Sequence, residues 1–173
     1  MFKDYNKYKV LKVFLYNSTE SFRLRELSRK VGIAPFSLSN YLNEFEKEGL
    51  IGIHIKDKIK FYTAQRDNLR FSRYQKLSIQ YELYESGVID KLWDELHPEF
   101  IILYGSYAKG EAIESSDIDI FIMCRDKKIN IEEYERKLGK KLHLMFHLRD
   151  KIPNELKNNL VNGIVMRGYF KAI

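Results

Sequence analysis

The sequence predicts an α+β protein made of two small units that are joined by a helical connector. Helical apolar spacing and a hairpin pattern fill residues 1–66, helical spacing continues through 67–97, and apolar strands alternate with helical segments over 98–173. The chain has 173 residues, of which 45% are hydrophobic. This composition provides enough hydrophobic residues for packed cores, and it excludes a disordered or low-complexity protein.

The charge and cysteine content narrow the function further. Residues 1–68 hold 13 Lys and Arg against 8 Asp and Glu, so most of the net charge of +6 lies there and suggests a polyanionic partner. The one cysteine, Cys124, excludes an internal disulfide framework and a Cys-rich zinc site. Since no apolar run is long enough to span a bilayer and the first residues do not resemble a signal peptide, we expect a cytoplasmic protein without a membrane partner.

Three helices and a hairpin are predicted in the N-terminal third. Apolar residues recur every three or four positions in each helical stretch. Gly32 is a typical stop for the second helix, and Pro35 is a typical start for the third. The predicted elements are helices over residues 4–17, 23–31 and 35–49 and a hairpin over 50–62, turning at Lys56-Asp57-Lys58.

This order of elements is that of a winged helix–turn–helix. The segments ELSRKVGI at 26–33, SLSNYL at 37–42 and EGLI at 48–51 resemble winged-helix transcription regulators of archaea and bacteria. The resemblance covers about residues 5–65 and implies a third helix in the major groove of double-stranded DNA, with the hairpin on the backbone or minor groove. The implied DNA-binding residues are Ser37, Ser39, Asn40, Asn43 and Lys58.

A different use of this unit stays open. Glu44, Glu46 and Glu48 make the end of the third helix acidic, which opposes contact with DNA. Winged helices also serve as dimerisation or protein-docking modules.

The connector predicts two helices, one ending near Ser86 and one over 88–96, and its Tyr- and Leu-rich stripe suits either a core or a dimer surface. We expect a homodimer.

The residues that are suited to catalysis lie in the C-terminal unit. An apolar strand over 100–104 leads into Gly105-Ser106, a helical segment over 107–111 and a second strand over 115–123. Asp117 and Asp119 are two apart at the start of that strand, so their carboxylates point to one face and suit Mg²⁺ or Mn²⁺. Gly105 lets a phosphate approach the backbone, and the Ser106 hydroxyl lies at the start of the following helix.

The pattern Gly-Ser, ten residues, Asp-x-Asp resembles the DNA polymerase beta-like nucleotidyltransferase superfamily, and most of all its minimal archaeal and bacterial members. The resemblance covers about residues 98–150 and implies a small mixed α/β nucleotidyltransferase domain. It implies metal-dependent transfer of a nucleoside monophosphate from a nucleoside triphosphate to a hydroxyl group. The favoured nucleoside monophosphate is AMP, donated by ATP. Asp117 and Asp119 would bind the metal, and Gly105, Ser106, Lys109 and Ser116 the nucleotide.

The family usually supplies a third carboxylate from the next strand, which this sequence lacks. The predicted strand over 141–148 instead places His143 and His147 on one face. Either imidazole suits metal ligation or base catalysis, and we take His143 as the third catalytic candidate. Alternatively, the strand is misaligned, or the activity is weak or lost. Asp126 and Asp150 are nearby acids, but both fall at strand ends. A helix over 152–162 and a strand over 164–170 complete the prediction.

Three functions therefore remain open. The first is a nucleotidyltransferase acting on a protein or small molecule. Related minimal enzymes often act as antitoxins that modify a HEPN-type toxin, which would here be a separate chain. The second is a DNA-binding regulator whose C-terminal domain keeps an inactive nucleotide pocket as a sensor. The third is a dimeric scaffold with neither activity.

Overall fold

The computed structural model describes residues 5–148 and 152–169 and divides into two compact units. The N-terminal unit runs to Gln75 and also contains Ala112–Glu114, although that segment follows much later in the chain. The C-terminal unit is formed by Lys76–Glu111 and by the chain from Ser115 onward. The domain boundaries expected after residues 66 and 97 stay predictions.

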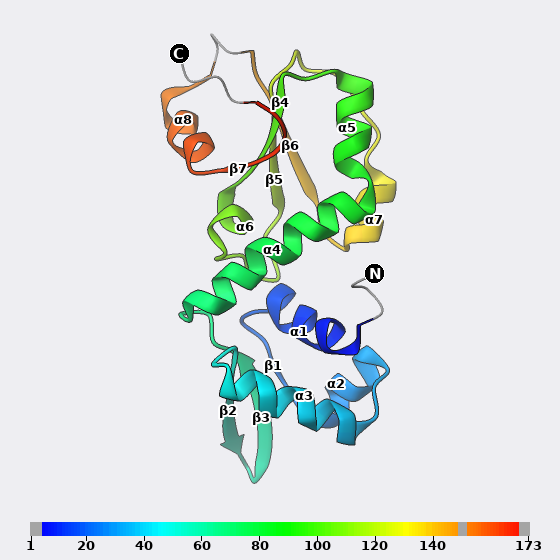
Figure 1. Cartoon of the computed structure of the whole chain (residues 1–173), viewed down its shortest axis with the longest axis vertical. Helices are drawn as coiled ribbons and strands as arrows, with labels where there is room; N and C mark the ends of the chain where they lie inside the picture. Colours follow the sequence, from blue (N-terminus) through cyan, green and yellow to red (C-terminus); the bar gives the residue numbers. More distant parts are fainter. Residues whose placement is uncertain (1–4, 149–151, 170–173) are drawn as a thin grey trace. The chain divides into compact units, whose positions relative to one another are not determined.

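The N-terminal unit has the predicted three helices and hairpin, which Figure 1 shows in blue to cyan-green. One additional two-residue strand, β1, pairs with β3 and was missed because two residues carry no periodicity. The sheet has the antiparallel order β1-β3-β2. The elements are α1 (Asn6–Tyr16), β1 (Ser21–Phe22), α2 (Leu24–Val31), α3 (Pro35–Lys47), β2 (Ile51–Lys56) and β3 (Ile59–Ala64).

The predicted helical spacing makes the core of this unit. Leu38 and Leu42 are fully buried on α3, as is Phe14 on α1. The rings of Phe14 and Phe22 meet edge to face with centroids 5.6 Å apart, so β1 also contributes to the core. The hairpin turns at Asp57 and Lys58, which both have positive φ (51° and 63°), as a two-residue hairpin turn requires.

The C-terminal unit is built on a four-stranded sheet of order β6-β5-β4-β7. β5 and β6 are parallel and are joined through α7, whereas the other neighbouring strands are antiparallel. The elements are α4 (Leu69–Ser86, shared between the units), α5 (Val88–Leu96), β4 (Phe100–Tyr104), α6 (Gly105–Lys109), β5 (Ile118–Ile122), α7 (Glu132–Leu138), β6 (Leu142–Phe146), α8 (Asn154–Val161) and β7 (Ile164–Gly168).

Some details differ from the predicted elements. α6 begins at Gly105 rather than Tyr107, and β5 begins at Ile118, so Asp117 immediately precedes the strand. α7 was not predicted, although acidic residues in its first turn and Gly139 at its end are typical helix signals. Phe170, the last residue of the predicted final strand, lies outside the described residues.

Both faces of this sheet are covered. In Figure 1, α8 and α5 lie on opposite sides of the strands. On the α8 side, Leu156 and Leu160 pack with buried residues of β4 and β5, among them Ile102, Tyr104 and Phe121. Asp119 is the register partner of Tyr104, so its side chain lies on the same face. Among the described helices, none is long and apolar enough to cross a membrane.

Candidate active site

One row across the sheet contains two of the three candidate catalytic residues, Asp119 and His143. Tyr104 on β4 is the register partner of Asp119 on β5, and Asp119 is in turn the partner of His143 on β6. Register partners project to the same face of a sheet, so these three side chains stand side by side. Burial, and to a lesser degree the Asp119 carboxylate, raise the pKa of Tyr104, which keeps its phenol protonated.

The Asp119 carboxylate is held between two neighbours. Its Oδ1 lies 3.0 Å from Nδ1 of His143. Its Oδ2 lies over Gly105, where a Cβ would come within 2.2 Å of that oxygen. Gly105 also has φ of +73°, a conformation that side chains rarely adopt. The glycine is therefore required both by the backbone turn and by the place that the carboxylate occupies.

The contact with Asp119 fixes the roles of the two imidazole nitrogens. A carboxylate only accepts hydrogen bonds, so Nδ1 of His143 donates in this contact. Nε2 is then left with the lone pair that can accept a proton or bind a metal. The His143 side chain is 56% exposed, so a ligand can reach it.

The structure separates the two histidines that the sequence left as alternatives. His147 lies four residues beyond His143, a separation of roughly 13 Å along a strand. Its ring stacks on Phe121, with centroids 6.2 Å apart. His143 is therefore the histidine beside the carboxylates.

Asp117 stands exposed just before β5, beside groups that the sequence did not single out. Burial, and secondarily the charge of Asp117, raise the pKa of Tyr107. Lys141 also lies close, because its carbonyl accepts a hydrogen bond from the amide of Ile118 at 2.9 Å. Its ammonium pairs with Glu135 at 2.8 Å. Parallel pairing of β5 with β6 brings Lys141 here, and no local pattern in the sequence indicates it.

The other predicted nucleotide-binding residues lie along the same stretch of chain. Ser106 is half-buried in α6, Lys109 is exposed at the end of that helix, and Ser116 is half-buried before Asp117. Asp126, the alternative acid, lies beyond the opposite end of β5. Asp150 lies outside the described residues.

The donor set fits a divalent cation that is shared with a substrate. Within residues 5–148 and 152–169, no three His, Cys, Asp or Glu side chains are grouped so as to hold a metal ion. Mg²⁺ commonly uses only one or two carboxylates and takes its remaining ligands from phosphates and water. Asp117 and Asp119 supply hard oxygen donors of this kind, with Oδ2 of Asp119 seated over Gly105.

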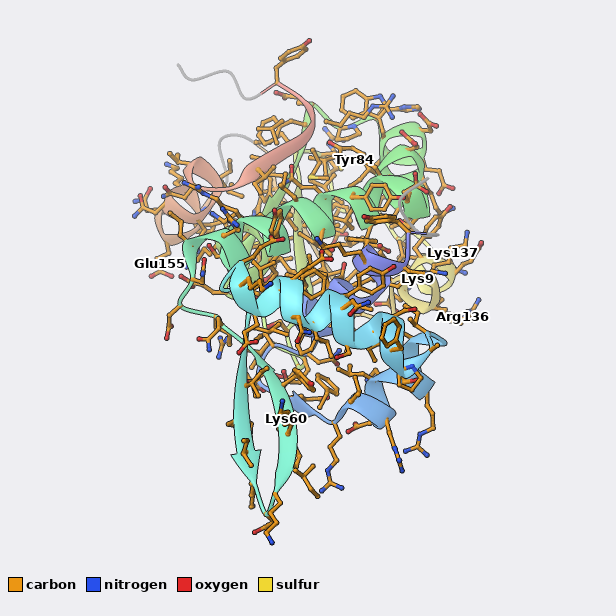
Figure 2. All side chains as sticks on the ribbon, turned by 60° about the horizontal axis from the view of Figure 1, so that its bottom comes forward. Lys9, Lys60, Tyr84, Arg136, Lys137 and Glu155 are labelled. Carbon is orange, nitrogen blue, oxygen red and sulfur yellow. The ribbon has the colours of Figure 1, made fainter. Side chains whose placement is uncertain are left out.

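The N-terminal unit presents a separate surface on α3. Ser37, Asn40 and Asn43 are exposed, and Ser39 is half-buried. Asn40 and Asn43 lie opposite the buried residues Leu38 and Leu42 at helical spacing. On the hairpin, Lys58 is exposed at the turn, and Figure 2 shows Lys60 on the neighbouring strand.

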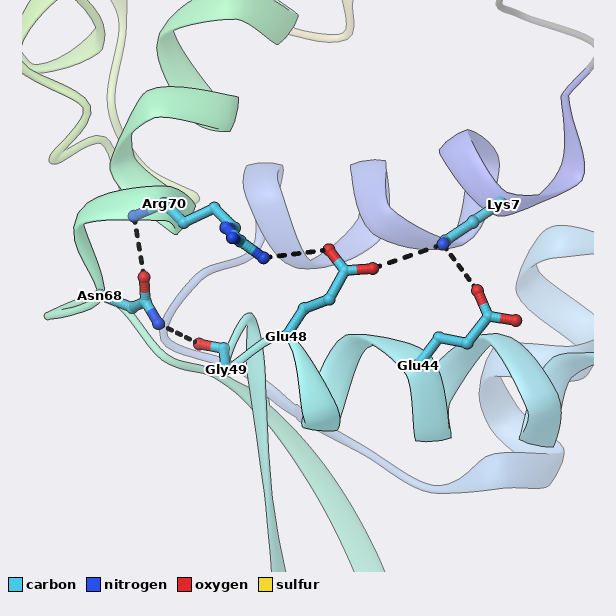
Figure 3. A network of polar contacts seen from close by, with 6 residues as sticks. All are labelled: Lys7, Glu44, Glu48, Gly49, Asn68 and Arg70. Atoms are coloured by element: carbon cyan, nitrogen blue, oxygen red, sulfur yellow. Dashed lines mark hydrogen bonds and ion pairs between the residues drawn. The ribbon is translucent and has the colours of Figure 1, made fainter.

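The acidic end of α3 is neutralised within the unit. Lys7 of α1 pairs with Glu44 at 2.6 Å and with Glu48 at 3.5 Å, and Arg70 of α4 pairs with Glu48 at 3.7 Å (Figure 3). Asn68 completes the network by donating to the Gly49 carbonyl at 2.7 Å. Two of the three glutamates that oppose DNA contact are thus compensated by cations, while Glu46 is exposed.

Comparisons with known proteins bear on the C-terminal part. Residues 87–168, just under half of the chain, match the model of the family described as "Polymerase beta, Nucleotidyltransferase". Among curated proteins, none matches this chain significantly.

Two solved structures resemble the chain. One is a toxin–antitoxin with AMP-PNP (26% identity, TM-score 0.38, covering 49% of this chain and 73% of that one). The other is a candidate nucleotidyltransferase from Sulfolobus solfataricus (13% identity, TM-score 0.34, covering 54% and 84%). The family match makes residues 87–168 similar to nucleotidyltransferase domains of the polymerase beta type.

Proposed function

We propose that the protein transfers a nucleoside monophosphate, AMP first among the candidates, from a nucleoside triphosphate to a hydroxyl of a protein or small molecule. The observation that carries this proposal is the row of Asp119 and His143 beside Gly105, inside the segment that matches the family. Asp117 immediately precedes β5, the strand that carries Asp119. These residues place two carboxylates and an imidazole at one end of the sheet, with Oδ2 of Asp119 over Gly105.

The transfer exchanges one phosphorus–oxygen bond for another. The acceptor oxygen forms a bond to the α-phosphorus, the bond to the β-phosphate oxygen breaks, and pyrophosphate leaves. We assign the acceptor proton to Nε2 of His143, since Nδ1 is engaged by Asp119. Asp119 orients the imidazole and stabilises its protonated form, as a carboxylate does for a general-base histidine.

Asp117 and Asp119 would hold Mg²⁺ or Mn²⁺ together with the triphosphate. The bound cation supplies charge neutralisation at the phosphates. The hydroxyls of Ser106 and Ser116 are candidate donors to a phosphate oxygen, whereas the Asp119 carboxylate occupies the space where Gly105 lacks a side chain. Lys109 is exposed at the end of α6, so its long side chain is a candidate for the outer phosphates.

Binding and transfer test this proposal separately. Calorimetry with a non-hydrolysable ATP analogue and Mg²⁺ should show metal-dependent binding, which Asp119→Asn weakens by about 100-fold or more. Asp126→Asn, beyond the opposite end of β5, is the matched control and should bind as the wild type does. A wild type without Mg²⁺-dependent binding would refute the proposal.

Transfer of label from α-labelled ATP measures the chemical step. His143→Gln should lower kcat by about 100-fold or more and leave the analogue's affinity nearly unchanged. A His143→Gln variant with wild-type kcat would refute the assignment of the proton to this histidine. The antitoxin role and a separate HEPN-type toxin partner remain expectations from the motif resemblance, and that toxin is the first acceptor to supply in the assay.

We propose DNA binding through the N-terminal unit as a second function, either beside catalysis or as a regulator with an inactive nucleotide pocket. The observation that favours it is the pairing of Glu44 and Glu48 with Lys7 and Arg70, which compensates two of the three glutamates that oppose contact of α3 with DNA (Figure 3). The exposed amide of Asn40 suits an adenine edge.

Salt-dependent binding to a short labelled duplex tests this second function. Removing Lys58 and Lys60 together should weaken binding and lower the slope of log affinity against log salt by about 2, since each phosphate contact contributes about 0.9. Lys137→Ala removes an exposed lysine of the C-terminal unit and should change neither. No binding by the wild type at low salt would contradict a DNA-binding role.

A further inference from the structure

A buried polar network holds the segment that leads into the two carboxylates. The side-chain amide of Gln75 accepts a hydrogen bond from the Ala112 amide at 3.0 Å and donates to the Ala112 carbonyl at 2.9 Å. The same amide also donates to the Leu15 carbonyl at 2.7 Å, near the end of α1. Gln75 is 1% exposed, so these bonds form away from water, where unpaired polar groups are costly.

Two further residues of the N-terminal unit bind the same segment. The Ser18 hydroxyl, 2% exposed, donates to the Ala112 carbonyl at 2.9 Å. Thr19 contacts the Glu114 carboxylate through its hydroxyl and through its amide, the latter at 3.4 Å. Ala112–Glu114 is thereby part of the N-terminal unit, whereas the residues before and after it belong to the C-terminal unit.

The attachment lies very close in sequence to the candidate metal ligands. Glu111, directly before it, still bonds α6, because its amide donates to the Ser106 carbonyl at 3.0 Å. Ala112 is five residues before Asp117, and Ile118 begins β5. The chain between α6 and β5 is therefore short, and it contains the residues Ala112–Glu114 that these hydrogen bonds hold.

We propose that Gln75 is a positioning residue for the carboxylate pair. It acts through Ala112, by fixing both polar groups of that peptide unit, and Ser18 assists at the carbonyl. The inference rests on the proposed nucleotidyl transfer, since it assigns Gln75 to the geometry of that site. It also gives a reason for a glutamine here, because an apolar side chain of similar size would leave the Ala112 amide unpaired.

The test compares Gln75→Leu with a matched glutamine of the same helix. Gln80 is half-buried, and its amide donates to the Lys76 carbonyl one turn back, so Gln80→Leu controls for loss of a glutamine from α4. Ser18→Ala provides a milder variant, because Ala112 keeps its bonds to Gln75. Each is measured in the full chain, well below its unfolding temperature.

Two readouts are taken for each variant. Hydrogen exchange over residues 111–117 should accelerate in Gln75→Leu, less in Ser18→Ala and not in Gln80→Leu. Mn²⁺ affinity in the presence of a non-hydrolysable ATP analogue, followed by electron paramagnetic resonance, should fall by about tenfold or more in Gln75→Leu, the low end for groups that orient metal ligands. Ser18→Ala should show a smaller loss, and Gln80→Leu none.

The outcomes distinguish the two proposals. Wild-type Mn²⁺ affinity in Gln75→Leu, whether or not exchange accelerates, would overturn the positioning role and leave the proposed function standing. Failure of the wild type itself to bind Mn²⁺ with the analogue would overturn the proposed function and this role with it. A loss of affinity in Gln75→Leu without faster exchange would overturn the route through Ala112.

Discussion

Replacing Gly105 by alanine is the sharpest perturbation that the site allows. The new Cβ would lie 2.2 Å from Oδ2, 3.0 Å from Cγ and 3.3 Å from Cβ of Asp119. Since carbon and oxygen atoms in contact need more than 3 Å, the carboxylate must move by about 1 Å, and a misplacement of that size costs on the order of 100-fold in rate. We therefore expect kcat/KM to fall about 100-fold, equivalent to ~2.7 kcal/mol of transition-state stabilisation.

The backbone strain of this substitution must be separated from the displacement of the carboxylate. Gly139 at the end of α7 has φ of +65° and nothing within 4 Å of its missing Cβ. Gly139→Ala thus introduces a comparable left-handed strain, about 1 kcal/mol in the free energy of unfolding, without the collision. Urea unfolding should show similar losses of stability for both variants.

Label transfer from α-labelled ATP and calorimetric binding of the Mg²⁺-analogue complex then report on the site. Gly105→Ala should lose both, and Gly139→Ala should keep both near the wild-type values. A Gly105→Ala variant that binds the Mg²⁺-analogue complex and transfers label as well as Gly139→Ala does would refute this reasoning. In that case, the position of the Asp119 carboxylate over Gly105 has no part in function.

Three further predictions concern stability and reactivity. The hydrogen bond of Lys7 to Glu44, together with nearby carboxylate charge, raises the pKa of Lys7 above 10.5, so the stabilisation is complete below pH 10.5 and is lost as pH rises through the raised value. Urea unfolding of Lys7→Met should show a loss below about 1 kcal/mol at pH 7 that vanishes at high pH; an unchanged difference would contradict this. Burial raises the pKa of the Cys124 thiol, so iodoacetamide at pH 8 should alkylate it more slowly than free cysteine, and an equal rate would refute the assignment. The Tyr84 hydroxyl donates to the Met166 carbonyl at 2.6 Å, so Tyr84→Phe should lower the free energy of unfolding by about 1 kcal/mol in urea, and wild-type stability would show that the bond contributes nothing.

Much of the local structure follows from the sequence. The spacing of Leu38, Leu42 and Phe45 identifies α3 and its buried face, and the apolar run over 100–104 identifies β4. These patterns are local, because a helix or strand repeats its side-chain directions every few residues. Elements with weak periodicity were missed, as β1 and α7 show.

The candidate site was predictable only in part. The spacing of Gly105, Ser106, Asp117 and Asp119 was enough to indicate a phosphate and metal site, and residues 87–168 match the corresponding family. The histidine pair could not be resolved, because alternation along a strand places His143 on the same face as its neighbour four residues on.

By itself, then, the sequence determined the element types, the Gly-Ser and Asp-x-Asp motif and the absence of a third acid from the predicted strand over 141–148. Only the tertiary structure decided that His143 is the register partner of Asp119, that Lys7 compensates the acidic end of α3, and that Gln75 holds Ala112. The physical reason is that strand register, ion pairing between helices and buried hydrogen bonds join residues far apart in the chain. Their geometry depends on how the elements pack, and no short-range pattern records it.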